Sequence, residues 1–425
     1  MRPDSRASRA ADSHRAARAG LLGLLIAGLL LSGAAAVMAE GEPPPLRLPL
    51  VARNAEPAYP VNRVGVGFLH HGELADYPLD RLPFGWYSDY SYDAAPERPS
   101  GVAYVQLLPV GQYAYPPDWD MVEAAVLANP GAVWIIGNEP ECPITDPDGN
   151  YVQGNRTPAE YATIFHAYYT RIHGWDSTAR FAIGGIVQPS PARFLWLERA
   201  LQAYQSEHGA PMPIDVWNIH NMLLEEQPDN RWGGGVPTGV TEDDWPGLAA
   251  RYPWWPIPER LVDGLMRYEP CDNRRADYFE KQLWAFRRWM AENGFRHVEL
   301  WITEYGVLYP AVSPDSPSYW PLFATFYGGQ CQPPYPADRE EAEAMGIDVV
   351  NAFMTHTLNY AAAARDATYG CSRDDNRLVQ RWLWYSLNGK SYEDDPAHGF
   401  NGSLCDWQAP HELTEYGQHW EAYFD

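Results

Sequence analysis

The sequence predicts a (β/α)8 barrel, in which eight parallel strands alternate with helices around a closed ring. Eight short apolar runs, each bounded by turn residues, follow one another after residue 60. They are continuously apolar rather than alternating, which is typical of parallel strands buried on both faces. Helix-like segments separate most of these runs, and strand alternating with helix favours a parallel sheet covered by helices.

The eight predicted strands belong to one long domain. They are residues 64–69, 84–87, 102–108, 132–137, 181–186, 214–219, 298–303 and 379–387. Barrels of this class span roughly 200 to 400 residues as a single domain. Residues 61–425 are therefore predicted to form one barrel.

Helix start and stop signals lie between the later strands. Thr157 and Glu160 form a capping box with Pro158 at the first helical position, and Gly294 follows another helical pattern as a C-terminal stop. The predicted helices are residues 157–172, 190–206, 277–293, 337–365 and 413–423. Residues 89–100 read as loop, so the first helices of the barrel are expected to be reduced.

A long insertion, residues 221–270, follows the sixth predicted strand and contains Trp232, Trp245, Trp254 and Trp255. Loops of this length are usually functional or disordered, and the tryptophans argue against disorder. The insertion is expected to form part of a binding cleft at the C-terminal end of the barrel, where active sites of this fold lie.

The N-terminus has the pattern of an export signal. Arginines precede an apolar run at residues 21–31, and small residues end at Ala39. Residues 1–39 are predicted to be a signal peptide, with an uncleaved anchor through residues 19–39 as the alternative. Residues 40–60 read as a proline-rich linker. The protein is thus expected to be secreted or extracytoplasmic.

Composition restricts the partners. A net charge of −24 disfavours nucleic acid and anionic lipid, and favours a neutral or cationic ligand. The chain has 18 Trp and 27 Tyr, whose flat rings can line a sugar-binding groove, although large folds also bury tryptophans. No membrane contact is expected beyond a possible anchor, and a monomer is expected.

The five cysteines are disulfide candidates in an exported chain. Two pairings are considered, Cys371 with Cys405 and Cys271 with Cys331, which leave Cys142 unpaired. None of the cysteines has metal-ligand spacing. His70 and His71 are adjacent rather than spaced as ligands, so no metal site and no cofactor are predicted.

Two carboxylates end predicted strands. Glu139 lies in "WIIGNEPE" (134–141), at the end of the fourth strand, and Glu304 lies in "LWITEYG" (300–306), at the end of the seventh. In a barrel both would reach the same mouth. Glycoside hydrolysis needs two such carboxylates, one to protonate the leaving oxygen and one to attack the anomeric carbon or activate water.

These segments resemble the clan of retaining (β/α)8-barrel glycoside hydrolases, which is cellulase-, mannanase- and β-glycosidase-like. The resemblance covers the chain from about residue 60 to the end, including "LTEYGQHWEAYF" (413–424). It implies Glu139 as general acid/base, Asn138 as hydrogen-bond donor to the sugar 2-hydroxyl, and Glu304 as the nucleophile that forms a glycosyl-enzyme intermediate.

The resemblance implies further positions. His220, which follows the sixth strand, resembles a histidine near the nucleophile. Members of the clan commonly have an aromatic residue two positions later, where this chain has Met222, so Tyr305 or a loop tyrosine is expected to bond the nucleophile instead. Trp384, in "RWLWYSL" (381–387), resembles the tryptophan that floors the sugar subsite.

Three other residues are weaker candidates. His70 is expected to contact a sugar hydroxyl, and Trp86 either lines the cleft or only packs. Glu141 is expected to be solvated or paired rather than catalytic.

The sequence thus predicts an exported retaining hydrolase acting on a β-linked oligo- or polysaccharide. Glu139 must start protonated and Glu304 ionised, so their pKa values must be pushed apart, with donors near Glu304 keeping it charged. The alternative is a catalytically silent carbohydrate-binding barrel at the cell surface. An inverting hydrolase or a transglycosylase would use the same glutamates.

Overall fold

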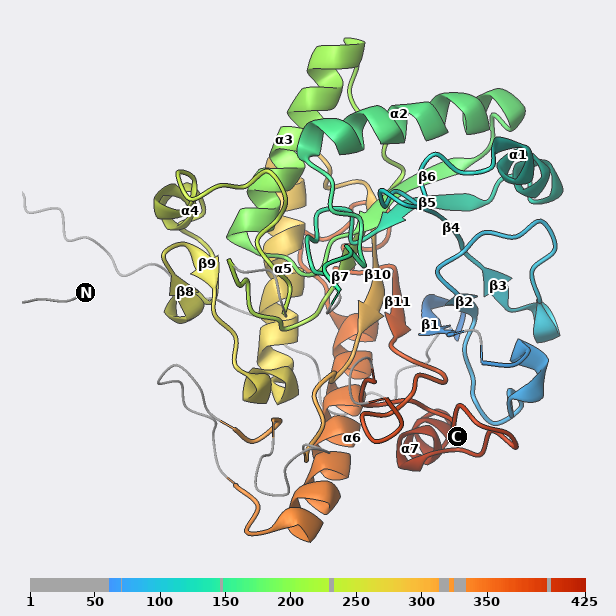
Figure 1. The fold of residues 1–425 in the computed structure, drawn as a ribbon, viewed down its shortest axis with the longest axis vertical. Coiled ribbons are helices and arrows are strands. Elements are labelled where there is room, and N and C mark those ends of the chain that lie inside the picture. Colours follow the sequence, from blue (N-terminus) through green and yellow to red (C-terminus); the bar gives the residue numbers. More distant parts are fainter. Residues whose placement is uncertain are drawn as a thin grey trace, which may run out of the picture. The chain divides into compact units, whose positions relative to one another are not determined.

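The computed structural model describes residues 61–69, 71–145, 148–228, 233–312, 321–324, 334–395 and 399–425. These residues form a ring of parallel strands with helices outside it (Figure 1). The predicted signal peptide and linker lie outside the described residues, and those boundaries stay predictions. Among the described helices, none is both long and apolar enough to cross a bilayer.

In the described part of the chain, nine strands form the ring. They are β1 (Val64–Gly67), β2 (Trp86–Ser88), β3 (Ala103–Tyr104), β4 (Gln106–Leu108), β5 (Val133–Asn138), β6 (Arg180–Gly185), β7 (Val216–His220), β10 (Glu299–Tyr305) and β11 (Arg381–Trp384). Their order is β3-β2-β1-β11-β10-β7-β6-β5-β4, and each pair is parallel. Because only Val105 separates β3 from β4, the chain itself closes the ring. The eight predicted strands are confirmed, with β3 and β4 sharing the third.

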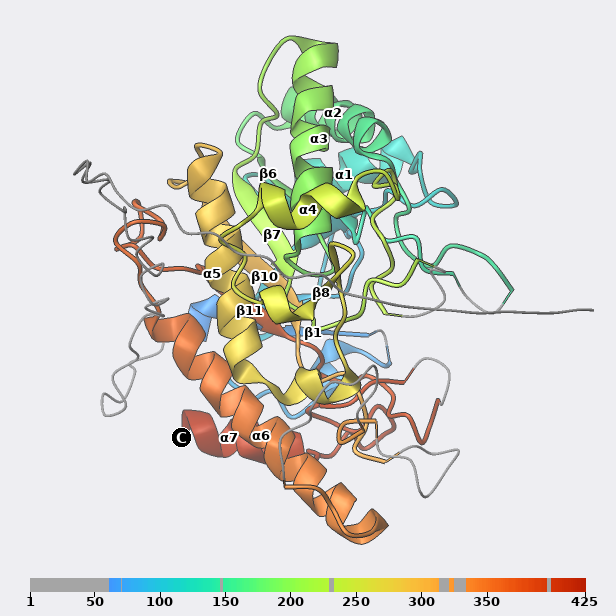
Figure 2. The same cartoon turned by 90° about the vertical axis from the view of Figure 1, so that its left-hand side faces the viewer.

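Helices cover the outside of the ring. They are α1 (Trp119–Ala128), α2 (Pro158–Trp175), α3 (Pro191–His208), α4 (Trp245–Arg251), α5 (Ala276–Glu292), α6 (Arg339–Ala363) and α7 (Glu415–Phe424). The five predicted helices are confirmed, and the capping box of Thr157 and Glu160 is present at the start of α2. Helices α2 and α3 lie beside each other, as do α6 and α7 (Figure 2).

The first barrel helices are reduced, as predicted. In the described part of the chain, only single-turn 3-10 helices, Leu74–Asp76 and Pro99–Gly101, separate the first three barrel strands. Helix α1 was not predicted. Asp118 caps it by accepting from the backbone N–H groups of Asp120 and Met121, which is an ordinary helix start signal.

The insertion after β7 contains α4 and a short hairpin of β8 (Leu261–Val262) and β9 (Leu265–Met266). The rings of Trp254 and Trp255 pack against Phe194 of α3, and Trp254 also contacts Trp284 of α5. Trp232 lies outside the described residues. Trp254 and Trp255 therefore cover the outer helices instead of lining a cleft.

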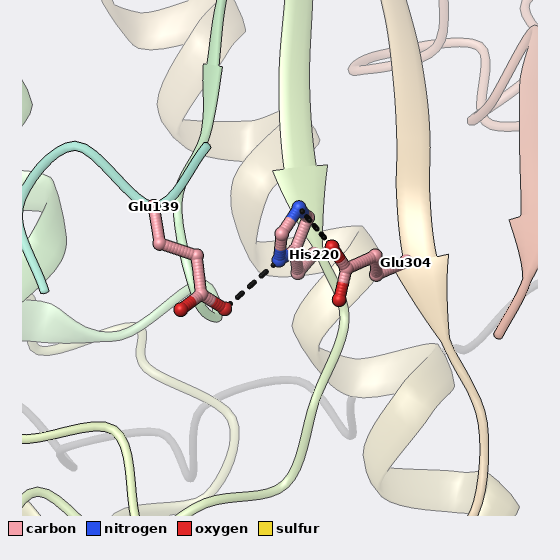
Figure 3. A group of neighbouring side chains, drawn as sticks. All are labelled: Glu139, His220 and Glu304. Atoms are coloured by element: carbon pink, nitrogen blue, oxygen red, sulfur yellow. Dashed lines mark hydrogen bonds and ion pairs between the residues drawn. The ribbon is translucent and has the colours of Figure 1, made fainter. Parts of the chain in front are cut away.

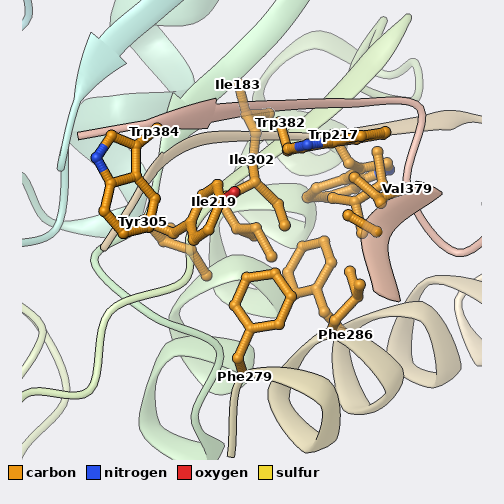
Figure 4. Close-up of a cluster of buried hydrophobic side chains, with 14 of the residues drawn as sticks. Ile183, Trp217, Ile219, Phe279, Phe286, Ile302, Tyr305, Val379, Trp382 and Trp384 are labelled. Atoms are coloured by element: carbon orange, nitrogen blue, oxygen red, sulfur yellow. The ribbon is translucent and has the colours of Figure 1, made fainter. Parts of the chain in front are cut away.

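Among the described residues, two apolar clusters form the core. The inner cluster fills the barrel and includes Trp86 and Trp301. The outer cluster lies between strands and helices, where Phe279 and Phe286 of α5 pack against Ile302 of β10 (Figure 4). Burial of large side chains on both faces of the strands explains why their sequence is continuously apolar.

One predicted disulfide is wrong. Cys142, Cys371 and Cys405 carry free, buried thiols, so Cys371 does not pair with Cys405. The Cys371 thiol faces the backbone carbonyl of His297 at 3.6 Å instead. Cys271 is disulfide-bonded. Its predicted partner, Cys331, lies outside the described residues, so that pairing stays a prediction.

Candidate active site

Glu139 follows β5 directly and has a φ angle of 41°, in the left-handed region. Side chains other than glycine are unfavourable there by about 1–3 kcal/mol, and such residues cluster at functional sites. Three backbone hydrogen bonds hold the residue. Its N–H donates to Gly185 at 2.9 Å, and its carbonyl accepts from Cys142 and Gly154, each at 3.1 Å. The turn therefore fixes where the Glu139 side chain leaves the strand.

His220 and Glu304 face each other at the ends of neighbouring strands. They are partners in the register between β7 and β10, which shifts between Ile302 and Glu304. The N–H of Asn221 donates to the carbonyl of Glu304 at 2.9 Å and continues the pairing beyond the strand. Parallel strands end at one edge of the barrel, so this register brings both side chains to the same mouth as Glu139.

The imidazole of His220 lies between the two carboxylates (Figure 3). Its Nδ1 is 3.0 Å from Oε1 of Glu139, and its Nε2 is 3.4 Å from Oε1 of Glu304. One ligand-type atom from each residue lies within 4.8 Å of the other two. Glu139 is 9% exposed, Glu304 8% and His220 0%. The site is thus a nearly buried carboxylate pair bridged by a fully buried histidine.

Burial dominates the electrostatics of Glu304. The pKa of Glu304 is raised to about 7: burial is the largest cause and the charge of Glu139 adds to it, while His220 and the neighbouring Tyr90 hydroxyl partly oppose the increase. The expected donors, His220 and Tyr90, do lower the pKa of Glu304, but the desolvation of the carboxylate outweighs them.

The pKa of His220 is raised although burial alone would lower it. The attraction of Glu304 and Glu139 outweighs the burial of the ring. The protonated imidazole therefore stabilises negative charge on either carboxylate.

Two half-buried tyrosines that sequence reasoning missed lie beside Glu304. Burial raises the pKa of Tyr90 and of Tyr385, and the charges of Glu304 and Glu139 contribute to both increases. Their ring centroids are 6.2 Å apart, and Tyr385 contacts Phe400 at 5.3 Å. Because Met222 replaces an aromatic residue after His220, a loop tyrosine was expected to bond Glu304, and Tyr90 lies in the position to do so. Their position in the sequence could have identified them, because each tyrosine lies within two residues of the end of a barrel strand.

Other predicted residues are not brought together with the carboxylates. Tyr305 is buried against Phe279 and Trp384, with ring centroids 5.1 and 5.4 Å away (Figure 4). Trp384 is 0% exposed, and its Nε1 donates to the carbonyl of Gly402 at 2.8 Å. Neither ring offers a surface for a sugar in this structure, because each faces the outer core.

Trp86 fills the interior of the barrel instead of lining a cleft. It is 0% exposed and its Nε1 donates to the carbonyl of Arg63 at 3.0 Å. His70 lies outside the described residues. Asn138 is half-buried and directly precedes Glu139, and its Nδ2 donates to Oε1 of Gln153 at 3.2 Å. Its predicted bond to a sugar hydroxyl stays a prediction.

Glu139, His220 and Glu304 are also residue types that bind metals. Ligand atoms on a tetrahedral zinc ion lie about 3.3 Å apart, given bonds of roughly 2.0–2.2 Å. The set spreads over as much as 4.8 Å, so it would have to contract around an ion. The absence of a metal site stays a prediction.

We expect Gly185→Ala to destabilise the fold by about 1–3 kcal/mol and to lower activity. A Cβ there would lie 2.6 Å from Cδ2 and Nε2 of His220 and 3.0 Å from Oγ1 of Thr303. The buried imidazole would have to move away from the carboxylates. Chemical denaturation measures the stability. Gly174→Ala in α2 is the control, since its added Cβ would meet nothing within 4 Å beyond the neighbouring backbone of its own helix. Equal stability of the two variants would contradict the prediction.

No protein-family model matches the sequence, and no curated protein matches it either. Solved structures give matches of low identity. One is a GH128 (subgroup II) endo-beta-1,3-glucanase from Sorangium cellulosum, with 13% identity and a TM-score of 0.43 over 85% of this chain and 98% of that chain.

Two further structures are similar. A glucosidase from Croceicoccus marinus has 11% identity and a TM-score of 0.44, over 87% of this chain and 68% of that chain. A GH128 (subgroup VII) oligosaccharide-binding protein from Trichoderma gamsii has 14% identity and a TM-score of 0.39, over 86% and 96%. These likenesses concern the fold alone, and the barrel assignment rests on the strand order.

Proposed function

We propose that the protein is a retaining glycoside hydrolase that cleaves β-glycosidic bonds by double displacement. The supporting observation is the short separation of Glu139 and Glu304, whose nearest ligand-type atoms lie within 4.8 Å at the barrel mouth. Carboxyl groups are about 5–5.5 Å apart in retaining enzymes and about 6.5–9.5 Å in inverting ones, which must admit a water between them. The spacing therefore favours the retaining mechanism over the inverting alternative.

In this mechanism Glu139 protonates the departing glycosidic oxygen while Glu304 attacks the anomeric carbon. Glu139 then accepts a proton from the water that hydrolyses the glycosyl-enzyme. His220 contacts both carboxylates and offers a path for a proton from Glu304 to Glu139. The Asn138 amide, beside Glu139, donates to a sugar hydroxyl.

The test is turnover of aryl β-glycosides and of β-glucan, mannan and xylan, with the first-formed anomer identified by NMR. A β-anomer as first product supports the proposal, and an α-anomer overturns double displacement. Glycan binding without turnover of any substrate would favour the silent carbohydrate-binding barrel. Transfer of the glycosyl group to added sugar rather than water would indicate a transglycosylase.

We also propose export through residues 1–39. The supporting observation is the arginine-rich start followed by the apolar run at 21–31. N-terminal sequencing of protein from the medium and from the membrane fraction tests it. Mature protein starting after Ala39 supports cleavage, and full-length protein in the membrane supports the anchor.

The acidic limb of kcat/KM is expected at about pH 7 and should move to higher pH in Tyr90→Phe. The nucleophile must be ionised, burial raises the pKa of Glu304 to about 7, and the Tyr90 hydroxyl lowers it. Removing that hydroxyl favours the neutral carboxyl, so kcat/KM falls further below pH 7. The limb belongs to the coupled carboxylate–histidine group rather than to Glu304 alone.

A pH series with an aryl β-glycoside measures this shift. Tyr335→Phe, a change on a tyrosine that is 50% exposed, is the matched control and should leave the limb in place. Movement of the Tyr90→Phe limb to lower pH would show that the hydroxyl does not stabilise the Glu304 carboxylate.

A further inference from the structure

Two neighbouring loops at the barrel mouth carry exposed large apolar side chains. Tyr113, in the loop after β4, is 72% exposed, and Tyr151 and Val152, in the loop after β5, are 37% and 55% exposed. The other large apolar side chains exposed in the described part of the chain are scattered over several elements; they are Val61, Met121, Leu127, Val262 and Tyr335. Single exposed apolar residues are ordinary, whereas a group of them marks a binding surface.

The two loops are fastened to each other. Nε of Arg156 donates to the carbonyl of Val110 at 2.7 Å, and a Cβ on Gly111 would lie 3.6 Å from the carbonyl oxygen of Gln153. The N–H of Tyr115 donates to Gly111 at 2.9 Å and closes a turn that presents Tyr113. The exposed rings are thus carried by a joined pair of loops.

This surface continues into the catalytic site on the side of Glu139. Gln153, two residues after Tyr151, accepts from the Asn138 amide at 3.2 Å. The next residue, Gly154, donates its N–H to the carbonyl of Glu139 at 3.1 Å. The loop that carries Tyr151 is therefore the one that holds the proposed acid/base, while Tyr90 and Tyr385 lie beside Glu304.

We propose that Tyr113 and Tyr151 bind sugar rings on the leaving-group side of the cleaved bond, so that the substrate is an oligo- or polysaccharide extending across these loops. The inference rests on the proposed function, because Glu139 protonates the oxygen that departs with those sugars. Sugar rings have apolar C–H faces that pack on aromatic faces, and tyrosine is a large, rigid contact surface with few rotatable bonds. The exposed hydroxyls can donate to sugar hydroxyls as the rings stack.

The experiment compares two substrates for Tyr113→Ala and Tyr151→Ala. One substrate is whichever of the three polymers β-glucan, mannan and xylan the wild type cleaves fastest. The other is an aryl β-glycoside. We expect kcat/KM to fall about tenfold on the polymer and to change less than about twofold on the aryl glycoside. Leu127→Ala, on α1 and 60% exposed, is the control and should alter neither. Equal losses on both substrates, or no loss on the polymer, would overturn the inference.

Binding without turnover separates this inference from the proposed function. Cello-, manno- and xylo-oligosaccharides are titrated calorimetrically into Glu304→Gln, with and without the tyrosine substitutions. Weaker binding after the tyrosine substitutions supports the sugar surface even if the wild type hydrolyses nothing. Unchanged binding overturns it even if hydrolysis is found. Wild-type self-association that both tyrosine substitutions abolish would assign the surface to a second copy of this chain instead.

Discussion

Glu304→Gln is expected to lower kcat on an aryl β-glycoside by about 10⁴-fold or more, since it removes the nucleophile of the proposed reaction. Glutamine has nearly the same shape as glutamate and cannot form the glycosyl-enzyme. Its amide is also neutral, so the desolvation that raises the pKa of Glu304 no longer opposes folding at high pH. The variant should therefore stay folded, and its loss of activity should be independent of the leaving group.

Glu139→Gln is expected to behave differently. Loss of a general acid costs about 10²–10⁴-fold on substrates whose leaving group needs protonation. A nitrophenolate departs without a proton, so the first step should remain fast on a nitrophenyl glycoside while water attack slows. The expected signature is a burst of nitrophenolate equal to the enzyme concentration, followed by slow turnover.

Stopped-flow absorbance with leaving groups of graded acidity measures both variants. Glu343→Gln, on the exposed part of α6, is the control and should match the wild type. A burst in Glu304→Gln and none in Glu139→Gln would exchange the two roles. Wild-type activity in Glu304→Gln would remove this residue from the site.

The barrel was predictable because its strands are buried on both faces. The continuous run at residues 132–137 and the run at 298–303 became β5 and β10, since neither strand has a polar face to break the pattern. The carboxylates were predictable for a related reason. Parallel strands of a barrel end at one mouth, so Glu139 and Glu304, each at the end of a run, had to approach each other.

The direction of a ring was not predictable from position alone. Successive side chains of a strand point to opposite faces, and Trp384 and Tyr385 follow one another at the end of β11. Trp384 turns to the outer core, while Tyr385 lies near the carboxylates. The prediction that Trp384 floors the sugar subsite therefore placed the ring on the wrong face of β11. The sequence carries both rings in one apolar run and does not mark which residue faces the mouth.

Ion pairs between residues far apart in the sequence could not be predicted either. Arg193, at the start of α3, is fully buried and joins two carboxylates that are far apart in the sequence. Its Nε lies 2.8 Å from Oε1 of Glu141, and its Nη1 lies 2.5 Å from Oε1 of Glu226 in the insertion. Glu141 had been expected to be solvated or paired, and it is paired and buried. Because Glu141 follows Glu139 by two residues, this cluster also braces the acid/base turn.

Arg193→Met is expected to destabilise the protein by about 3–5 kcal/mol at pH 8, which is the usual effect of leaving buried carboxylates without their cation. Methionine fills part of the volume but cannot donate to Glu141, to Glu226 or to the Gly234 carbonyl, which Nη2 of Arg193 contacts. Burial already raises the pKa of Glu141, and Arg193 lowers it. Without Arg193 that pKa rises further.

The sign of the pH dependence follows from this shift. A carboxyl whose pKa is raised in the folded state contributes fully to the stability of the fold below its unfolded pKa. That contribution is lost as pH rises through the folded pKa. The gap between Arg193→Met and wild type should therefore be small near pH 4.5 and widen towards pH 8. Urea unfolding across that range measures it. Arg339→Met, which breaks an exposed pair with Glu343, is the control and should cost less than about 1 kcal/mol at every pH. A gap that is constant with pH would show that Arg193 acts through packing rather than through its charge.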